Sequence, residues 1–215
     1  MASDVDICNM ALSHVGSDAI ITSIDPSDGT VEAGHCARFY PQARAELLEN
    51  FRWGFASKRQ QLNPVVNISD AWAFAYAVPS DALRPLRLLQ SGSAAASGDI
   101  FDLDTTYPLV LPNERGGAEF EIEGTTLFAN EEEPVLLYTT DVTDTGRFTP
   151  TFRTALSYLL ASFLAGPLIK GGEGARTALK LREIANGVAN SAAAINANSA
   201  REPALQMSET VQARR

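Results

Sequence analysis

The side chains of this chain that could bind a transition metal are two histidines and two cysteines, His14, His35, Cys8 and Cys36. Zinc sites place such ligands at short, regular spacings, and the spacing here matches none of them. Cys8 and Cys36 also fall on stretches that we expect to face a hydrophobic core, where a free thiol acts as a small apolar group. We therefore predict structural roles for all four side chains, and neither a metal nor a cofactor.

A group of aspartates is the second candidate for chemistry. Asp99, Asp102 and Asp104 lie close together in the sequence. The glycine and the terminal glutamate of a calcium-binding loop are missing, so a solvated acidic edge is favoured over a weak cation site.

A row of glutamates, Glu119, Glu121 and Glu123, alternates with apolar residues. A glycosidase needs two carboxylates about 5–10 Å apart in a cleft, whereas alternation along a strand exposes all three together. The row is interpreted as the solvated face of a strand. The chain also lacks the G-x-S-x-G and H-E-x-x-H motifs, and in the glycine-rich stretch 170–174 the lysine precedes the glycines. We predict that the chain is not an enzyme.

The charge of the chain is concentrated in its middle. Residues 99–148 carry twelve acidic and two basic residues, while the formal charge of the whole chain is −9. Such a surface repels nucleic acid at long range, so tight DNA or RNA binding is disfavoured. The N-terminus lacks the basic segment followed by an uninterrupted apolar segment that is typical of a secretory signal, so we expect none. Two cysteines suit a reducing compartment.

The chain is organised around a predicted helix over residues 149–169. Thr149 can act as its N-cap, and Pro150 suits the first helical position. Residues 154–169 carry no charge. This run is shorter than the roughly 20 residues that span a bilayer, and Gly166 and Pro167 interrupt its end. We therefore predict the central helix of a core rather than a membrane span.

Three further helices are predicted around this one. The first is capped by Ser3 and ends at Gly16, and the second covers residues 30–51 with a kink at Pro41. The last covers residues 173–197. Its stripe of small and large apolar residues is a candidate interface between subunits, with packing on its own core as the alternative. The stripe contains Ala178, Leu181, Ala185 and Val188.

Between the helices the apolar period changes to that of strands. We expect strands within residues 72–78, 83–89, 118–123, 126–129 and 134–140. The predicted fold class is therefore α+β, with a helical bundle domain built from N- and C-terminal helices and an inserted antiparallel β domain. The predicted boundaries are 1–60 and 147–199 for the helical domain, 61–146 for the β domain and 200–215 for an extended tail.

Three stretches, taken in order, resemble one known family. The first holds residues 7–12, Gly16, Cys36, 39–41, Ala43, Arg44, Leu47, Leu48, 53–56, Lys58 and Arg59; the second holds Trp72, Tyr76, Pro79, Asp81, Leu83 and Arg84; the third holds Tyr138, 142–144, Phe148, Pro150, Phe152, Ala155, Leu156, Leu160 and Ala161. In order and spacing these are similar to the tail tubular protein A family, the head-to-tail adaptors of short-tailed phages.

The resemblance implies a helical domain interrupted by a β domain, and no catalysis. It implies a virion protein, assembled in the host cytoplasm, of which twelve copies form a ring beneath the portal protein. The ring attaches the tail nozzle, a tail tubular protein B-like protein, and leaves a channel through which DNA passes without sequence-specific binding. In such adaptors the C-terminal segment commonly reaches into the portal. Here that segment would present Arg201, Leu205, Met207 and Val211.

Six aromatic residues are predicted to hold the two domains together or to have structural roles within them. The candidates are Trp53, Phe55, Trp72, Tyr76, Phe148 and Phe152. The Trp72 face is also a candidate ring interface, with a role in its own core as the alternative. The acidic middle segment would present carboxylates to the channel, where they would let DNA slide.

Two other functions remain open from the sequence. One is a tail-associated carbohydrate-binding or hydrolytic protein, which would need a cleft around residues 99–104. The other is a neck or head-completion protein of a long-tailed phage.

Overall fold

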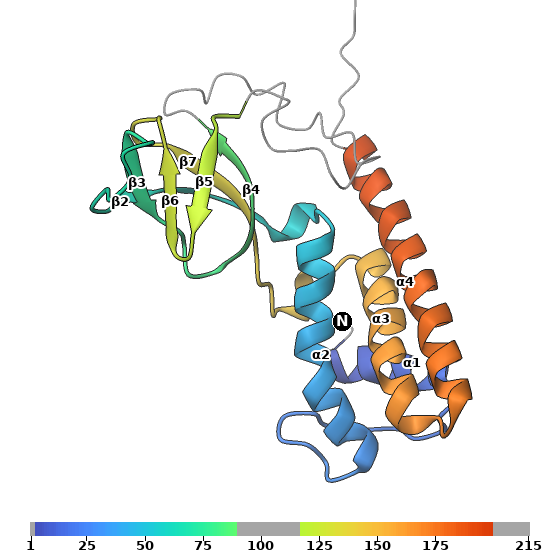
Figure 1. The fold of residues 1–215 in the computed structure, drawn as a ribbon. Coiled ribbons are helices and arrows are strands. Elements are labelled where there is room, and N and C mark those ends of the chain that lie inside the picture. The colour runs from blue at the N-terminus through green and yellow to red at the C-terminus, as the bar shows by residue number, and fades with distance from the viewer. Residues whose placement is uncertain (1–2, 90–116, 200–215) are drawn as a thin grey trace, which may run out of the picture.

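The computed structural model describes residues 3–89 and 117–199 (Figure 1). Within these ranges the fold is α+β, with four α-helices and two antiparallel sheets. The helices lie together in one part of the molecule and the strands in another. The predicted fold class is therefore confirmed.

Helix α3 (Pro150–Leu168) is the centre of the helical part. Thr149 caps it by accepting a hydrogen bond from the backbone N–H of Phe152 at 3.3 Å, as the sequence predicts. The helix is buried on several sides because the other helices surround it, and α4 (Gly172–Ser199) runs alongside it (Figure 1). Within the described ranges, no helix combines the length and the apolarity needed to cross a membrane.

The two N-terminal helices also begin where the sequence predicts. In α1 (Asp4–Val15) Ser3 and Asp6 form a reciprocal capping box, and Gly16 ends the helix in the left-handed conformation at φ 82°. Helix α2 (Val31–Asn50) is capped by Thr30 and contains Pro41. Both helices bury one face against the core around α3.

The strands form two sheets. The first has three strands in the order β1-β7-β4, and the second has four in the order β2-β3-β6-β5. Their bounds are β1 Ser57–Gln61, β2 Asn63–Pro64, β3 Phe74–Ala77, β4 Ala82–Leu89, β5 Phe120–Glu123, β6 Thr126–Ala129 and β7 Val135–Thr140. The sheets share a small core of their own, which contains Leu62, Tyr76, Leu88, Leu127, Leu136 and Tyr138.

Two details of the β region differ from the sequence-based expectation. Strand β1 has the sequence SKRQQ, which carries no apolar alternation, and it forms because its backbone pairs with β7. It begins at Ser57, before the predicted boundary at residue 61. In β3, the alternation of aromatic residues with alanines predicts one bulky face and one small face, but burial does not follow these faces, because Phe74 is exposed whereas Ala75 and Tyr76 are both buried.

Candidate functional site

Four aromatic side chains meet where the chain passes between the helices and the sheets. Phe152 lies in the first turn of α3. Its ring centroid is 4.8 Å from that of Trp53, 5.1 Å from that of Phe55 and 4.6 Å from that of Phe148. Trp53 and Phe55 lie on the segment that leaves the helices, and Phe148 lies on the segment that returns. The cluster therefore fastens both connecting segments to the start of the central helix. We call it the junction cluster.

Polar contacts reinforce the same junction. The guanidinium of Arg44 in α2 donates two hydrogen bonds to the carboxylate of Asp141, at 3.0 and 2.9 Å. Arg84 in β4 donates to the backbone carbonyl of Glu49 at 3.1 Å. A bidentate arginine–carboxylate pair such as Arg44–Asp141 fixes the orientation of the two side chains as well as their distance. The sheets are thus held against α2 by bonds that restrict how the two parts rotate.

Three side chains that are far apart in the sequence form a polar cluster on the three-stranded sheet. Lys58 Nζ lies 2.7 Å from Asp81 Oδ2, and the hydroxyl of Tyr138 donates to Asp81 Oδ1 at 2.8 Å. These residue types can perform acid–base chemistry, but their pKa values shift the wrong way for it. The bond to Asp81 raises the pKa of Lys58, and the bond to Lys58 lowers the pKa of Asp81. Both groups are held in their ordinary charged forms, so the arrangement suits an ion pair that orders the sheet.

The remaining aromatic candidates do not join the junction cluster. Tyr76 lies in the small core of the sheets, and its hydroxyl donates to the backbone carbonyl of Glu131 at 2.6 Å. The indole Nε1 of half-buried Trp72 donates to Glu121 Oε2 at 2.9 Å. The structure thus places both residues within the β region, where their contacts are structural rather than interdomain, because β3 pairs with β6 and packs inside the sheets.

The cysteines and histidines are spread over the helical core. Cys8 and Cys36 are fully buried and lie against each other, with the thiol of Cys36 and burial both raising the pKa of Cys8. His14 stacks on Tyr158 at 3.9 Å between ring centroids, and its Nε2 lies 3.2 Å from Ser157 Oγ. Among residues 3–89 and 117–199 there is no group of three or more potential metal ligands.

The glutamate row lies along the outward face of β5, with Glu119 immediately before the strand. Glu119, Glu121 and Glu123 are all exposed, and Phe120 and Ile122 between them pack against the core of the sheets. The row is therefore a solvated face, as its alternation indicates. The aspartates Asp99, Asp102 and Asp104, around which a carbohydrate-binding function would require a cleft, lie outside the described residues.

The small-residue stripe of α4 packs inside the chain. Leu181 and Ala185 are buried in the helical core, and Ala178 and Val188 pack against that core from its edge. Packing on the chain's own core is the alternative that the sequence left open beside a subunit interface. It leaves little exposed surface on these side chains for contact with a neighbouring subunit. Arg182 on the same helix pairs with Glu46 of α2. The four residues proposed to bind the portal, Arg201, Leu205, Met207 and Val211, lie outside the described residues.

Residues that carry the family resemblance are the ones that meet at the junction and beside it. Lys58 belongs to the first stretch, Asp81 to the second and Tyr138 to the third. Sequence reasoning did not foresee the contacts among them, because residues about 20 to 100 positions apart carry no local signal of proximity. No model of a known protein family matches this chain, and no curated protein matches it.

Proposed function

We propose that this chain is a structural virion protein, a head-to-tail adaptor of the tail tubular protein A kind. In this proposal twelve copies form a ring between the portal and a tail nozzle, and DNA passes through the central channel during ejection. The protein has no catalytic role in this scheme. It would be assembled in the host cytoplasm and reside at the neck of the particle.

The observation that carries the proposal is the convergence of the three resembling stretches. They are separated in the chain by up to about 80 residues, yet Lys58, Asp81 and Tyr138 lie within hydrogen-bonding distance. Trp53 and Phe152, from the first and third stretches, stack edge to face at 4.8 Å. A chance likeness of short motifs would not require them to share one structural location. The convergence supports a common architecture in which a helical body carries a fixed β region.

The architecture suits a structural subunit that transmits load. Two separate hydrophobic cores are joined by the junction cluster, by the Arg44–Asp141 pair and by the bond from Arg84 to the backbone of α2. An adaptor must keep its portal-facing and nozzle-facing parts at a fixed angle, and bidentate and aromatic contacts provide that rigidity. The exposed glutamate row of β5 is a candidate for the surface that faces DNA, because carboxylates repel phosphates.

The first test is the mass of the purified chain over a concentration series, by light scattering with negative-stain imaging. A ring near 276 kDa, for twelve chains of 23.0 kDa, is the expected result. If the chain alone is monomeric, the portal protein from the same genome is added. A chain that forms no ring alone and none on the portal would contradict the proposed function.

A further inference from the structure

We infer that the chain binds a phosphate group, as inorganic phosphate or a phosphate monoester, on one face of the three-stranded sheet beside the end of α2. The site is a group of arginines that gathers there although the formal charge of the chain is −9. We call it the arginine cluster. Its members are Arg52, Arg59, Arg84 and Arg87.

Strand pairing places three members of the cluster on one face of the sheet. Arg59 in β1 and Arg87 in β4 both lie directly opposite Leu137 of β7. Arg84 lies opposite Thr139, two residues further along β7. Directly opposed residues and alternate residues of one strand share a face of the sheet. The three arginines therefore lie on the face that is turned away from the small core of the sheets.

The fourth member of the cluster comes from the end of α2. Arg84 donates to the backbone carbonyl of Glu49 at 3.1 Å, so the last turn of α2 lies beside β4 (Figure 1). Arg52 follows this turn directly and is half-buried. Burial lowers the pKa of Arg52, and the positive charges of Arg87 and Arg59 lower it further. The charges of these side chains therefore act on one another at close range.

Two of the arginines have no partner in the described part of the chain. No hydrogen bond or ion pair joins Arg52 or Arg59 to another residue of the ranges 3–89 and 117–199. The acidic residues at the ends of β4 and β7, Asp81 and Asp141, are paired with other cations. A half-buried guanidinium loses water from N–H donors that need acceptors, so an unpaired one favours a bound anion.

A buried hydroxyl on the same face also lacks a partner. Thr139 is 1% exposed, and within the described ranges its Oγ1 has no hydrogen bond. In the strand pairing it lies between Ser57 of β1 and Arg84 of β4. A buried hydroxyl without a partner is costly in free energy. Arginine side chains are long, and their rearrangement around an anion would bring an oxygen acceptor to this hydroxyl.

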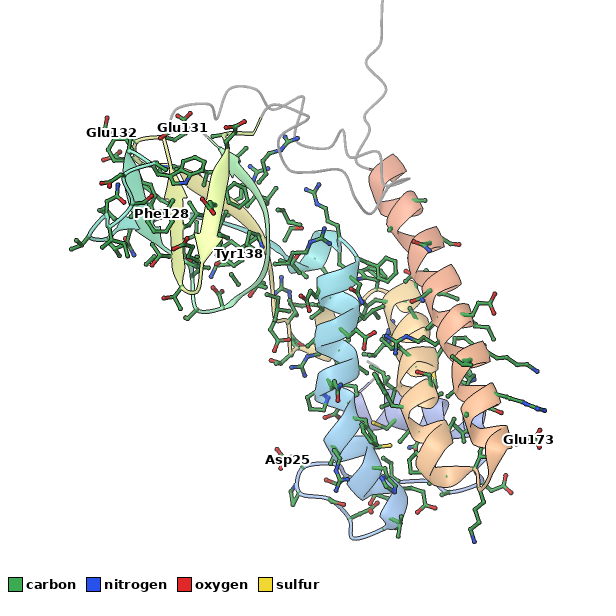
Figure 2. The ribbon with its side chains drawn as sticks, viewed as in Figure 1. Asp25, Phe128, Glu131, Glu132, Tyr138 and Glu173 are labelled. Atoms are coloured by element: carbon green, nitrogen blue, oxygen red, sulfur yellow. The ribbon has the colours of Figure 1, made fainter. Side chains whose placement is uncertain are left out.

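The cluster suits a doubly charged phosphate better than a carboxylate or a nucleic acid. Each guanidinium has two parallel N–H donors that match two phosphate oxygens, and several positive charges at one place favour a dianion. A nucleic-acid strand presents single charges in a row and needs cations along a track. The β region offers no such track, because Figure 2 shows Glu131 and Glu132 at its end away from the helices.

Titration of the full chain with inorganic phosphate tests the inference, by calorimetry at constant ionic strength and about pH 8, where phosphate is doubly charged. We expect Arg52→Gln to weaken binding about tenfold or more, because it removes a charge and its paired donors. Thr139→Val keeps the shape of the side chain and should weaken binding about threefold or more, because it removes the hydroxyl. Arg38→Gln removes an exposed arginine of α2 and serves as the control, with unchanged affinity.

Urea unfolding in chloride buffer separates a binding role from a structural one. Neither Arg52 nor Thr139 Oγ1 has a partner in the described chain, so Arg52→Gln and Thr139→Val should unfold at no lower urea concentration than the unmodified chain. Phosphate should then raise the midpoint of the unmodified chain and of Arg38→Gln more than that of the two variants. This comparison removes the general stabilisation that phosphate gives to any protein.

The outcomes decide between this inference and its alternatives. Glycerol phosphate in the same titration represents a monoester, and binding of either ligand that Arg52→Gln weakens supports the site. No saturable binding of either, or equal affinity in all variants, would overturn it. A single-stranded oligonucleotide without a terminal phosphate that binds through Arg52 while both small ligands fail would show a nucleic-acid surface instead. Lower urea midpoints of both variants in chloride would show that the side chains serve the fold. None of these results depends on ring formation, so the proposed function is tested separately.

Discussion

The indole Nε1 of Trp53 donates a 2.9 Å hydrogen bond to the backbone carbonyl of Leu47, near the end of α2. This carbonyl belongs to the last turn of the helix, where carbonyl groups have no partner within the helix itself. The fully buried indole therefore closes the end of α2 while its ring faces Phe152. One side chain joins the end of one helix to the beginning of another.

Replacing this tryptophan tests how much the junction cluster contributes to stability. Trp53→Ala removes the ring from a closely packed core and leaves the carbonyl of Leu47 without its donor. We expect a loss of about 3–5 kcal/mol in the free energy of unfolding, measured with urea. Trp72→Ala removes the same side chain from a half-buried position and should cost less. Equal losses for the two variants would contradict the importance of the cluster.

Acidification should weaken the loop between α1 and α2. The carboxylate of Asp28 accepts hydrogen bonds from the backbone N–H and the hydroxyl of both Thr22 and Thr30, and these bonds lower its pKa. An aspartate with a lowered pKa adds stability that is present above its unfolded pKa, near 3.9, and is lost as pH falls further. The urea concentration at the unfolding midpoint should therefore decrease as the pH is lowered below about 4. This decrease should be smaller in Asp28→Asn. Parallel curves for the two proteins would refute this assignment.

A second pH dependence is expected at higher pH. Burial lowers the pKa of His14, which stacks on Tyr158. Because the unfolded chain binds the proton more readily, stability should fall as pH decreases through the unfolded value, near 6.5. His14→Gln should flatten the dependence of the urea midpoint between about pH 8 and 5. A variant that keeps the slope of the unmodified chain would show that another group titrates there.

The two thiols should be protected in the folded chain. Cys8 and Cys36 have no exposed surface, and burial contributes to the raised pKa of Cys8. Thiolates are the reactive form, so a thiol-reactive disulfide reagent should modify neither residue in buffer and both in concentrated urea. Rapid modification of the native chain would indicate that α1 opens away from the core.

The packing of α4 on α3 can be tested by enlarging one alanine. Ala185 is fully buried in the helical core, and Ala185→Leu should lower the free energy of unfolding by about 1–3 kcal/mol through overpacking. Ala175 is exposed on the same helix, so Ala175→Leu should stay within about 0.5 kcal/mol of the unmodified chain. If Ala185→Leu changes only self-association and not unfolding, the stripe serves contacts between subunits after all.

The sequence by itself determined the helices. Ser3 and Thr149 cap helices in the structure as their types and positions predict, and Gly16 ends the first helix. The uncharged run of α3 is the buried centre of the helical part. These features depend on residues within one or two helical turns, which is why local patterns are sufficient to predict them. The α+β class followed from the change between the helical period of the terminal segments and the strand period of the middle segment.

Only the tertiary structure decided where the chain's polar groups and exposed surfaces meet. Strand β1 forms because its backbone pairs with β7. Its five residues show no alternation of apolar and polar side chains that would predict a strand. The contacts of Asp81 with Lys58 and Tyr138 depend on three strands that come together in one sheet. The stripe of α4 is compatible with its own core or with a neighbour, and only the position of α3 selects between them. Contacts between distant segments are set by packing and register, which a single sequence does not encode locally.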